Sequence, residues 1–140
     1  MNIVFAADGS ACTKKALACL ITHEGLIGQQ GELFVLNVQV KLPPHVKRAL
    51  GAAAVAEYAR DEADKVLAPV KRFLDRHPVR YRSAWVVGTP ADEILRATER
   101  EHAHLIVMGT HGLGMVGRAL MGSVAQRVIT GSEIPVLLVK

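Results

Sequence analysis

Residues 109–123 read GTHGLGMVGRALMGS, and this stretch decides how the rest of the chain is interpreted. It holds five glycines in fifteen residues, follows the apolar run at 105–108 and precedes a helical pattern that starts at Ser123. Backbone N–H groups approach an anion closely where no Cβ intervenes, and a helix N-terminus adds unpaired donors. The order of strand, glycine-rich loop and helix therefore predicts a site for a phosphate compound.

Outward from this stretch, apolar runs alternate with helical patterns along the chain. Strands are predicted at 3–7, 33–38, 79–87, 105–108 and 135–139, and helices at 10–24, 59–77, 89–101 and 123–131. Because helical segments connect the strands, the fold class is predicted to be α/β, with helices on both faces of a parallel, doubly wound sheet. Ligands of such sheets bind at the carboxyl ends of the strands, so Asp8 and Gly109 should face one crevice if their strands are neighbours.

Three local features carry expectations of their own. Residues 39–54 include Pro43-Pro44 and interrupt the helical pattern, which predicts a loop, with at most a helical turn, that could cover a site. Pro69 is expected to bend the long helix in which it lies. Ser123 and Gln126 have the spacing of a capping box, with Ser123 as the N-cap.

Size and composition indicate a single compact domain over residues 1–140, which can bury about 70% of its unfolded surface. No apolar run reaches the roughly 18 residues of a membrane span, and residues 1–5 are too short for a signal peptide, so a cytoplasmic protein is expected. Cys12 and Cys19 lie about 10 Å apart along one predicted helix, too far for a disulfide, and should be buried as small hydrophobic residues. The net charge of +4 comes from scattered basic residues without interleaved aromatics, so nucleic-acid binding is not expected.

Two phosphate motifs fit the glycine-rich stretch only in part. Residues 112–117 match the dinucleotide pattern G-x-G-x-x-G, but only 23 residues follow Gly117, too few for the acidic residue and the second half-domain that the pattern needs. The same residues imitate the spacing of a P-loop. Arg118 replaces its lysine, however, and Ala119 lacks the hydroxyl that would hold Mg²⁺. Neither interpretation is retained.

A third spacing uses Gly109, Gly112, Gly122 and Ser123. Phosphates would lie between the first two glycines and the backbone donors of residues 122–124, with the Ser123 hydroxyl adding a further bond. The alternative is that these glycines only form tight turns and let the following helix pack closely on the sheet.

With these residues, the chain resembles the universal stress protein family of the nucleotide-binding type. That family's signature, G-2x-G-9x-G-[ST], is filled by Gly109, Gly112, Gly122 and Ser123, and the similarity also covers residues 4–10, 88–90 and 106–112. The resemblance implies a single-domain Rossmann-like fold of the adenine nucleotide alpha hydrolase type, with three layers and a five-stranded parallel sheet in the order 3-2-1-4-5. It also implies ATP, AMP or cyclic AMP as ligand, with Mg²⁺ accompanying ATP, and a homodimer.

Carried over residue by residue, the resemblance implies two groups of nucleotide-binding positions. One group would frame the adenine and ribose, and consists of Ala6, Ala7, Asp8 and Val38. The other would line the ribose-phosphate side, and consists of Met108, Gly109, His111, Gly112, Gly122, Ser123 and Val124. Asp8 could instead only cap the first helix, Val38 only fill the core, and His111 only be a solvated loop residue.

Catalytic and metal-binding patterns are not recognisable in the sequence. The six histidines are dispersed, and no nucleophile-base arrangement or metal-ligand spacing is present. The favoured function is therefore an adenine-nucleotide-binding regulatory module of the stress response, and the alternatives are a slow Mg²⁺-dependent ATPase and a ligand-free dimeric interaction protein. The uncharged strand between Pro135 and Lys140 lies at a sheet edge in the implied order, and is expected to form the dimer interface.

Overall fold

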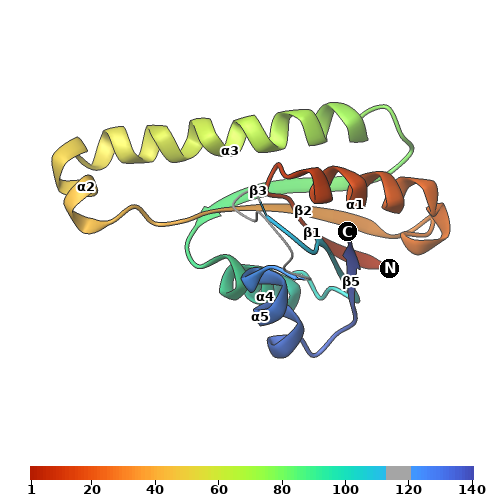
Figure 1. Ribbon diagram of the computed structural model, residues 1–140. Helices are drawn as coiled ribbons and strands as arrows, with labels where there is room; N and C mark the ends of the chain where they lie inside the picture. The colour runs from red at the N-terminus through yellow and green to blue at the C-terminus, as the bar shows by residue number, and fades with distance from the viewer. Residues whose placement is uncertain (113–120) are drawn as a thin grey trace.

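The computed structural model of the protein describes residues 1–112 and 121–140 (Figure 1). Helices and strands alternate along the chain as β1 (Asn2–Ala6), α1 (Ala11–Thr22), the 3-10 turn η1 (Glu24–Leu26), β2 (Glu32–Gln39), α2 (Pro44–Leu50), α3 (Ala52–Leu74), β3 (Tyr81–Val87), α4 (Pro90–Arg100), β4 (Leu105–Gly109), α5 (Ser123–Gly131) and β5 (Val136–Val139).

The strands form one parallel sheet in the order β3-β2-β1-β4-β5, which confirms the predicted fold class and strand order. Strand β1 lies at its centre, where Phe5 pairs with Val35 of β2 and Val107 of β4. From β1 the chain crosses to β2 on one side, and the later crossover reaches β4 on the other. The sheet therefore has a topological switch point at the carboxyl ends of β1 and β4.

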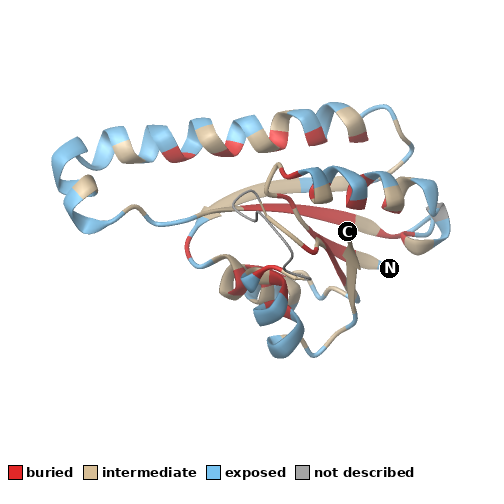
Figure 2. Ribbon diagram, in the orientation of Figure 1, coloured by how far each residue is buried: buried red, intermediate tan, exposed pale blue. Residues whose placement is uncertain are grey.

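Helices cover both faces of the sheet and bury a separate apolar core on each (Figure 1). Successive strand residues point to opposite faces, so Phe5 packs with α1 and α3 whereas Val4 packs with α4 and α5. Buried residues of the middle strands lie between these layers (Figure 2). None of the helices in the described ranges is long and apolar enough to cross a membrane.

The prediction of a loop over residues 39–54 is wrong, because α2 occupies Pro44–Leu50 and α3 begins at Ala52. Pro44 stands at the first helical position, where its fixed φ favours a helix start. Gly51, at φ +83°, then separates α2 from α3. Helix α2 buries no residue and α3 buries none before Ala59, so α2 and the first turns of α3 extend past the sheet, whereas the rest of α3 packs against it (Figures 1 and 2).

Three smaller expectations can be compared with the structure. The N-cap of α5 is Gly122 and not Ser123, so the predicted capping box is wrong. No side chain caps this helix. Cys12 and Cys19 are unpaired as expected, but both are only partly buried, because they lie at the edge of the α1 face that contacts the sheet. Helix α3 continues through Pro69 as one element.

Candidate functional site

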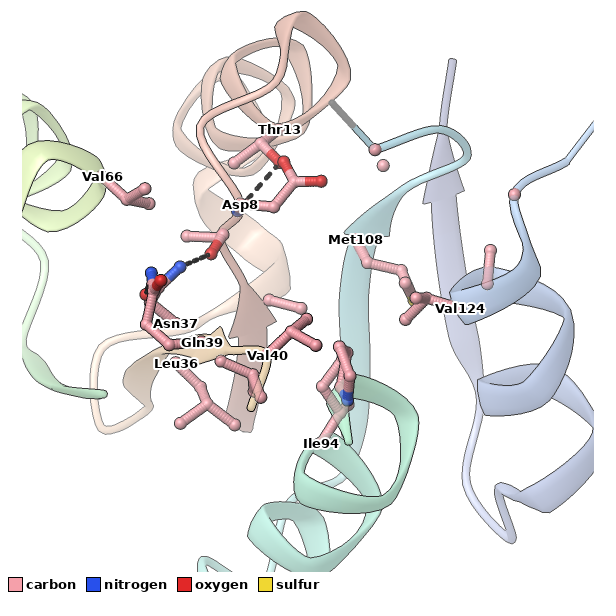
Figure 3. Close-up of a pocket in the computed structure, with 18 of the residues that line it drawn as sticks. Asp8, Thr13, Leu36, Asn37, Gln39, Val40, Val66, Ile94, Met108 and Val124 are labelled. Carbon is pink, nitrogen blue, oxygen red and sulfur yellow. Dashed lines mark hydrogen bonds between the residues drawn. The ribbon is translucent and has the colours of Figure 1, made fainter. Parts of the chain in front are cut away.

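A cavity of about 660 Å³ lies at the switch point, where β1, β2 and β4 end and α5 begins. Its volume is within the range of small-molecule sites, roughly 300–1,000 Å³. In Figure 3 the labelled polar residues Asp8, Thr13, Asn37 and Gln39 lie on the side formed by β2, α1 and the turn after β1, where the apolar Leu36 and Val66 also lie. The labelled residues across from them, Ile94, Met108 and Val124, are apolar.

All eleven sequence-predicted site residues line this one cavity: Ala6, Ala7, Asp8, Val38, Met108, Gly109, His111, Gly112, Gly122, Ser123 and Val124. Segments more than 100 residues apart are thus brought together, as expected if the strands ending at Asp8 and Gly109 are neighbours. Gly114, Gly117 and Arg118 lie outside the described residues. Arg127 contributes nothing to the cavity wall and instead contacts Asp92 at 3.2 Å.

Asp8 both shapes the turn before α1 and presents a carboxylate oxygen to the cavity. Its Oδ1 accepts hydrogen bonds from the Ser10 amide at 2.8 Å and the Thr13 hydroxyl at 2.6 Å, which fix the side chain. Its Oδ2 points toward Gly112, where an added Cβ would lie only 2.9 Å away. The helix-capping alternative therefore describes only one oxygen of Asp8. Oδ1 shapes the turn before α1, and Oδ2 faces the cavity.

Val38 offers unpaired backbone groups to the same cavity. The last hydrogen bond between β1 and β2 runs from the Ala7 amide to the Leu36 carbonyl at 2.9 Å. Groups facing one neighbour recur at every second residue of a strand, so the Val38 N–H and C=O face the same side, beyond the point where β1 ends. Within the described residues, no backbone partner from β1 reaches them.

The three signature glycines have different neighbours. A Cβ on Gly109 would lie 2.6 Å from Cys12 Cβ, so this glycine lets α1 pack against β4. Among the described residues, a Cβ on Gly112 would meet Asp8 Oδ2 alone, across the cavity, and one on Gly122 would meet the Thr110 carbonyl at 3.2 Å. The packing alternative therefore holds for Gly109, whereas Gly112 keeps the cavity wall open.

The N-terminus of α5 supplies the donors that an anion would need. The first intrahelical bond runs from the Gln126 amide to the Gly122 carbonyl at 3.1 Å, so the amides of residues 123–125 have no partner within the helix. The Gly122 amide itself donates to the Thr110 carbonyl at 2.6 Å. Among the lining residues that the structure describes there is no lysine or arginine, so the anion-binding groups on this part of the wall are backbone amides.

The wall also contains residues that sequence reasoning did not select: Thr13, Leu36, Asn37, Gln39, Val40, Leu42, Tyr58, Glu62, Val66, Pro90, Ile94, Thr110 and Ala125. One of them had a visible signal, because Asn37 is the polar residue in an otherwise apolar strand. Tyr58, Glu62 and Val66 come from α3, which carries no motif. In residues 1–112 and 121–140, no cluster of three or more histidine, cysteine and carboxylate side chains could hold a metal ion.

The fold and cavity define an α/β protein with a doubly wound sheet and a ligand pocket at its switch point. Comparison with known families narrows this class: the model of the universal stress protein family matches residues 1–140, and the chain belongs to that family.

Two relatives support the assignment, one aligned over nearly its whole length and the other over about half of it. A universal stress protein of Thermus aquaticus is 35% identical over 139 residues, which cover 99% of this chain and 98% of the relative. Universal stress protein MJ0531 of Methanocaldococcus jannaschii is 40% identical over 86 residues. That alignment covers 61% of this chain and 51% of the relative, so the match spans about half of the longer protein.

Solved structures share the fold. The protein MJ0577 superposes with a TM-score of 0.86 at 28% identity, covering 99% of this chain and 94% of the other. Two universal stress protein structures at 22% identity and a TM-score of 0.69, covering 100% of this chain and 97% and 98% of theirs, have cAMP in one case and dAMP in the other, the latter from Archaeoglobus fulgidus. Two of the structures that share this fold thus contain an adenine nucleotide.

Proposed function

We propose that this protein binds an adenine nucleotide, ATP or AMP, in the switch-point cavity and acts as a regulatory module of the stress response. The observation that carries the proposal is the cavity itself, which joins an apolar slot to the uncapped N-terminus of α5. Family membership and the nucleotide-bound structures of similar fold support it. A single domain over residues 1–140 and a cytoplasmic location belong to the same proposal.

The base and ribose would occupy the side formed by β1 and β2. Ala6 and Val38 provide apolar surface there, and the Val38 N–H and C=O offer one donor and one acceptor. Met108 of β4 belongs to the opposite, ribose-phosphate side. Asp8 Oδ2 is an acceptor for a ribose hydroxyl, because Oδ1 is already held by Ser10 and Thr13. The Ala7 backbone lies in the same part of the wall.

The phosphates would occupy the side formed by β4 and α5. The amides at the start of α5 and the dipole of that helix favour negative charge, and the Ser123 hydroxyl adds a donor. Gly109, His111 and Gly112 complete this part of the wall. If ATP binds with Mg²⁺, the Asp8 carboxylate and the Ser123 hydroxyl would supply oxygen ligands of the type that this ion prefers.

Calorimetric titration of the protein with ATP, AMP and cyclic AMP tests the proposal, with UMP as the control nucleotide. Saturable heat is expected with at least one adenine nucleotide and not with UMP. The variant Ser123→Glu adds a carboxylate where phosphate would bind, while an acid in the first turn stabilises the helix. Its affinity for ATP should fall at least about 10-fold, which is about 1.4 kcal/mol. No heat with any adenine nucleotide at millimolar concentration would contradict the proposal.

The ATPase alternative is tested in the same samples. Incubation with ATP and Mg²⁺ should leave ATP intact if the protein only binds. Product in stoichiometric excess over protein, lost in Asp8→Asn, would show an enzyme. A cavity that binds no nucleotide, in a protein whose melting temperature ignores ATP, would favour the interaction-protein alternative.

We also propose a homodimer through the strand between Pro135 and Lys140. Strand β5 is the last of the sheet, its four residues are all half-buried, and its outer edge carries backbone groups that a second copy could pair with. The variant Leu138→Pro removes one amide donor from this edge and should give monomers in light scattering. An unchanged dimer mass would place the interface elsewhere.

A further inference from the structure

Asn37 is a buried polar side chain in an apolar strand, and only 2% of its surface is exposed. A buried amide destabilises the fold unless its groups are hydrogen-bonded. Here Nδ2 donates to the Ala7 carbonyl at 2.8 Å, and Oδ1 accepts from Gln39 Nε2 at 2.7 Å. Both bonds lie at the wall of the cavity (Figure 3).

The Ala7 carbonyl is where the ladder between β1 and β2 would continue. The Ala7 amide bonds to the Leu36 carbonyl, so the next bond of a regular parallel ladder would join the Val38 amide to the Ala7 carbonyl. That bond is missing among the described backbone pairs, and the Asn37 side chain fills its place. Ala7 is buried, so its carbonyl needs a donor, and Asn37 supplies it without using the Val38 amide.

We propose that Asn37 is a positioning residue that ends the ladder one step early and keeps the Val38 N–H and C=O free for the base of the ligand. The inference rests on the proposed nucleotide binding. An N–H donor beside a C=O acceptor complements a base edge on which a ring nitrogen stands next to an amino group, as on adenine. With the Val38 N–H bonded to Ala7, this donor would be lost, and the ring nitrogen of the base would have no hydrogen-bond partner there.

Gln39 fixes the direction in which Asn37 acts. Because Gln39 Nε2 donates to Asn37 Oδ1, the Asn37 amide group is held with Nδ2 toward Ala7. The variant Gln39→Glu has nearly the same shape but offers an acceptor instead of a donor. Asn37 should then turn its Nδ2 toward Glu and its Oδ1 toward the Ala7 carbonyl, which would leave that carbonyl to the Val38 amide.

The first experiment measures amide hydrogen exchange at Val38 by NMR in the nucleotide-free protein. The amide should exchange fast in the natural sequence. In Asn37→Val it should slow at least about 10-fold, because the buried Ala7 carbonyl takes the nearest remaining donor. Gln39→Glu should slow it in the same direction and keeps the proposal testable if Asn37→Val does not fold. A Val38 amide that is already protected, or unchanged exchange in the folded variants, would overturn the inference.

The second experiment measures selectivity, which a purely structural role would not alter. 1-Deazaadenosine 5′-monophosphate has the amino group and phosphate of AMP but carries a C–H in place of the ring nitrogen that would accept from the Val38 N–H. The natural protein should prefer AMP by about 10-fold, the discrimination expected for about one hydrogen bond. Asn37→Val should reduce this ratio toward 1, while the control Gly25→Ala, which lies outside the cavity lining, should retain it. Equal ratios in the natural protein and Asn37→Val would overturn the inference.

The two experiments separate this inference from the proposed function. If no nucleotide binds, the exchange of the Val38 amide still shows whether Asn37 replaces the ladder bond, and only the proposed function fails. If AMP binds and neither exchange nor selectivity responds to Asn37→Val, the proposed function stands and the role of Asn37 is refuted.

Discussion

Polar groups at the two ends of the sheet differ in how many of their hydrogen-bonding positions are occupied. Where the strands begin, Arg82 of β3 donates to Glu32 and Glu101, and Arg100 also donates to Glu101. Phe34 lies beneath both guanidinium groups, 5.3 Å from Arg82 Cζ and 5.6 Å from Arg100 Cζ. The hollow at this end measures about 10 Å³, against about 660 Å³ at the end where the strands finish.

The difference is one of unused hydrogen-bonding capacity. At the closed end the charged groups pair with one another and with an aromatic ring, which leaves no room for a ligand. At the open end Asp8 uses one oxygen, Asn37 replaces a backbone bond, and the amides that begin α5 have no intrahelical partner. We therefore expect changes at the closed end to alter stability alone and changes at the open end to alter binding, except where a residue also packs the core.

Gly109 is that exception and should give the largest effect. In Gly109→Ala the new Cβ would meet Cys12 Cβ at 2.6 Å and the Cys12 backbone carbon at 3.1 Å, so α1 must move. Overpacking of this kind destabilises by about 1–3 kcal/mol, which is a decrease in Tm of roughly 3–10 °C for a chain of this size. Thermal unfolding followed by circular dichroism measures it. A Tm within 1 °C of the natural protein, taken as about the error of the measurement, would show that α1 has room to shift.

Gly112, three residues later, should show the opposite pattern. Within the part of the chain that the structure describes, the Cβ of Gly112→Ala would displace only Asp8 Oδ2, so the Tm should change little. The displaced carboxylate and the narrower cavity should weaken AMP binding by about 10-fold, or about 1.4 kcal/mol. Calorimetry measures the affinity, and Gly25→Ala is the matched control because its Cβ would meet nothing within 4 Å. Unaltered AMP affinity in Gly112→Ala would remove Gly112 from the binding site.

Periodic and spaced signals in the sequence predicted the strands and the crevice at their carboxyl ends, whereas the strand order and the eleven site positions came from the resemblance to the universal stress protein family. The apolar runs gave the five strands, and the spacing of Gly109, Gly112 and Gly122 indicated the loop and helix start. All eleven predicted positions line the cavity because the carboxyl ends of neighbouring parallel strands meet at one edge. Their role in nucleotide binding stays a prediction.

Features that depend on tertiary geometry could not be predicted in the same way. Helix α2 buries no residue, so no apolar stripe in the sequence identifies it. Pro44 indicates a break in the sequence pattern, but in the structure it starts the helix. Asn37 was visible as a polar residue in a strand, but its bond to Ala7 depends on where β1 ends. Ser123 and Gly122 differ by one position, and only the backbone angles decide which residue is the cap.

The closed end should give the smallest effect. Glu101→Gln keeps the shape of the side chain but removes the charge that faces Arg82 and Arg100. Both arginines are more than half exposed, and ion pairs of exposed groups contribute little, so the Tm should fall by only about 1–3 °C at neutral pH. AMP affinity should stay within about 2-fold of the natural value, since the residue lies far from the strand ends that form the cavity.

The pH dependence of this small effect follows from Glu101 itself. Burial raises the pKa of its carboxyl. Hydrogen bonds from Arg82 and Arg100 lower this pKa by more than burial raises it, so the pKa in the folded protein lies below its ordinary value. The charged form is therefore favoured by folding, and its contribution is present above the ordinary glutamate pKa of about 4.3 and is lost as the pH falls through the lower folded pKa. The Tm difference between the natural protein and Glu101→Gln should stay constant from about pH 7 to pH 5 and shrink as the pH falls below the ordinary pKa of about 4.3 toward the lower folded pKa. A difference that persists undiminished at about pH 3 would mean that Glu101 acts through packing rather than through its charge.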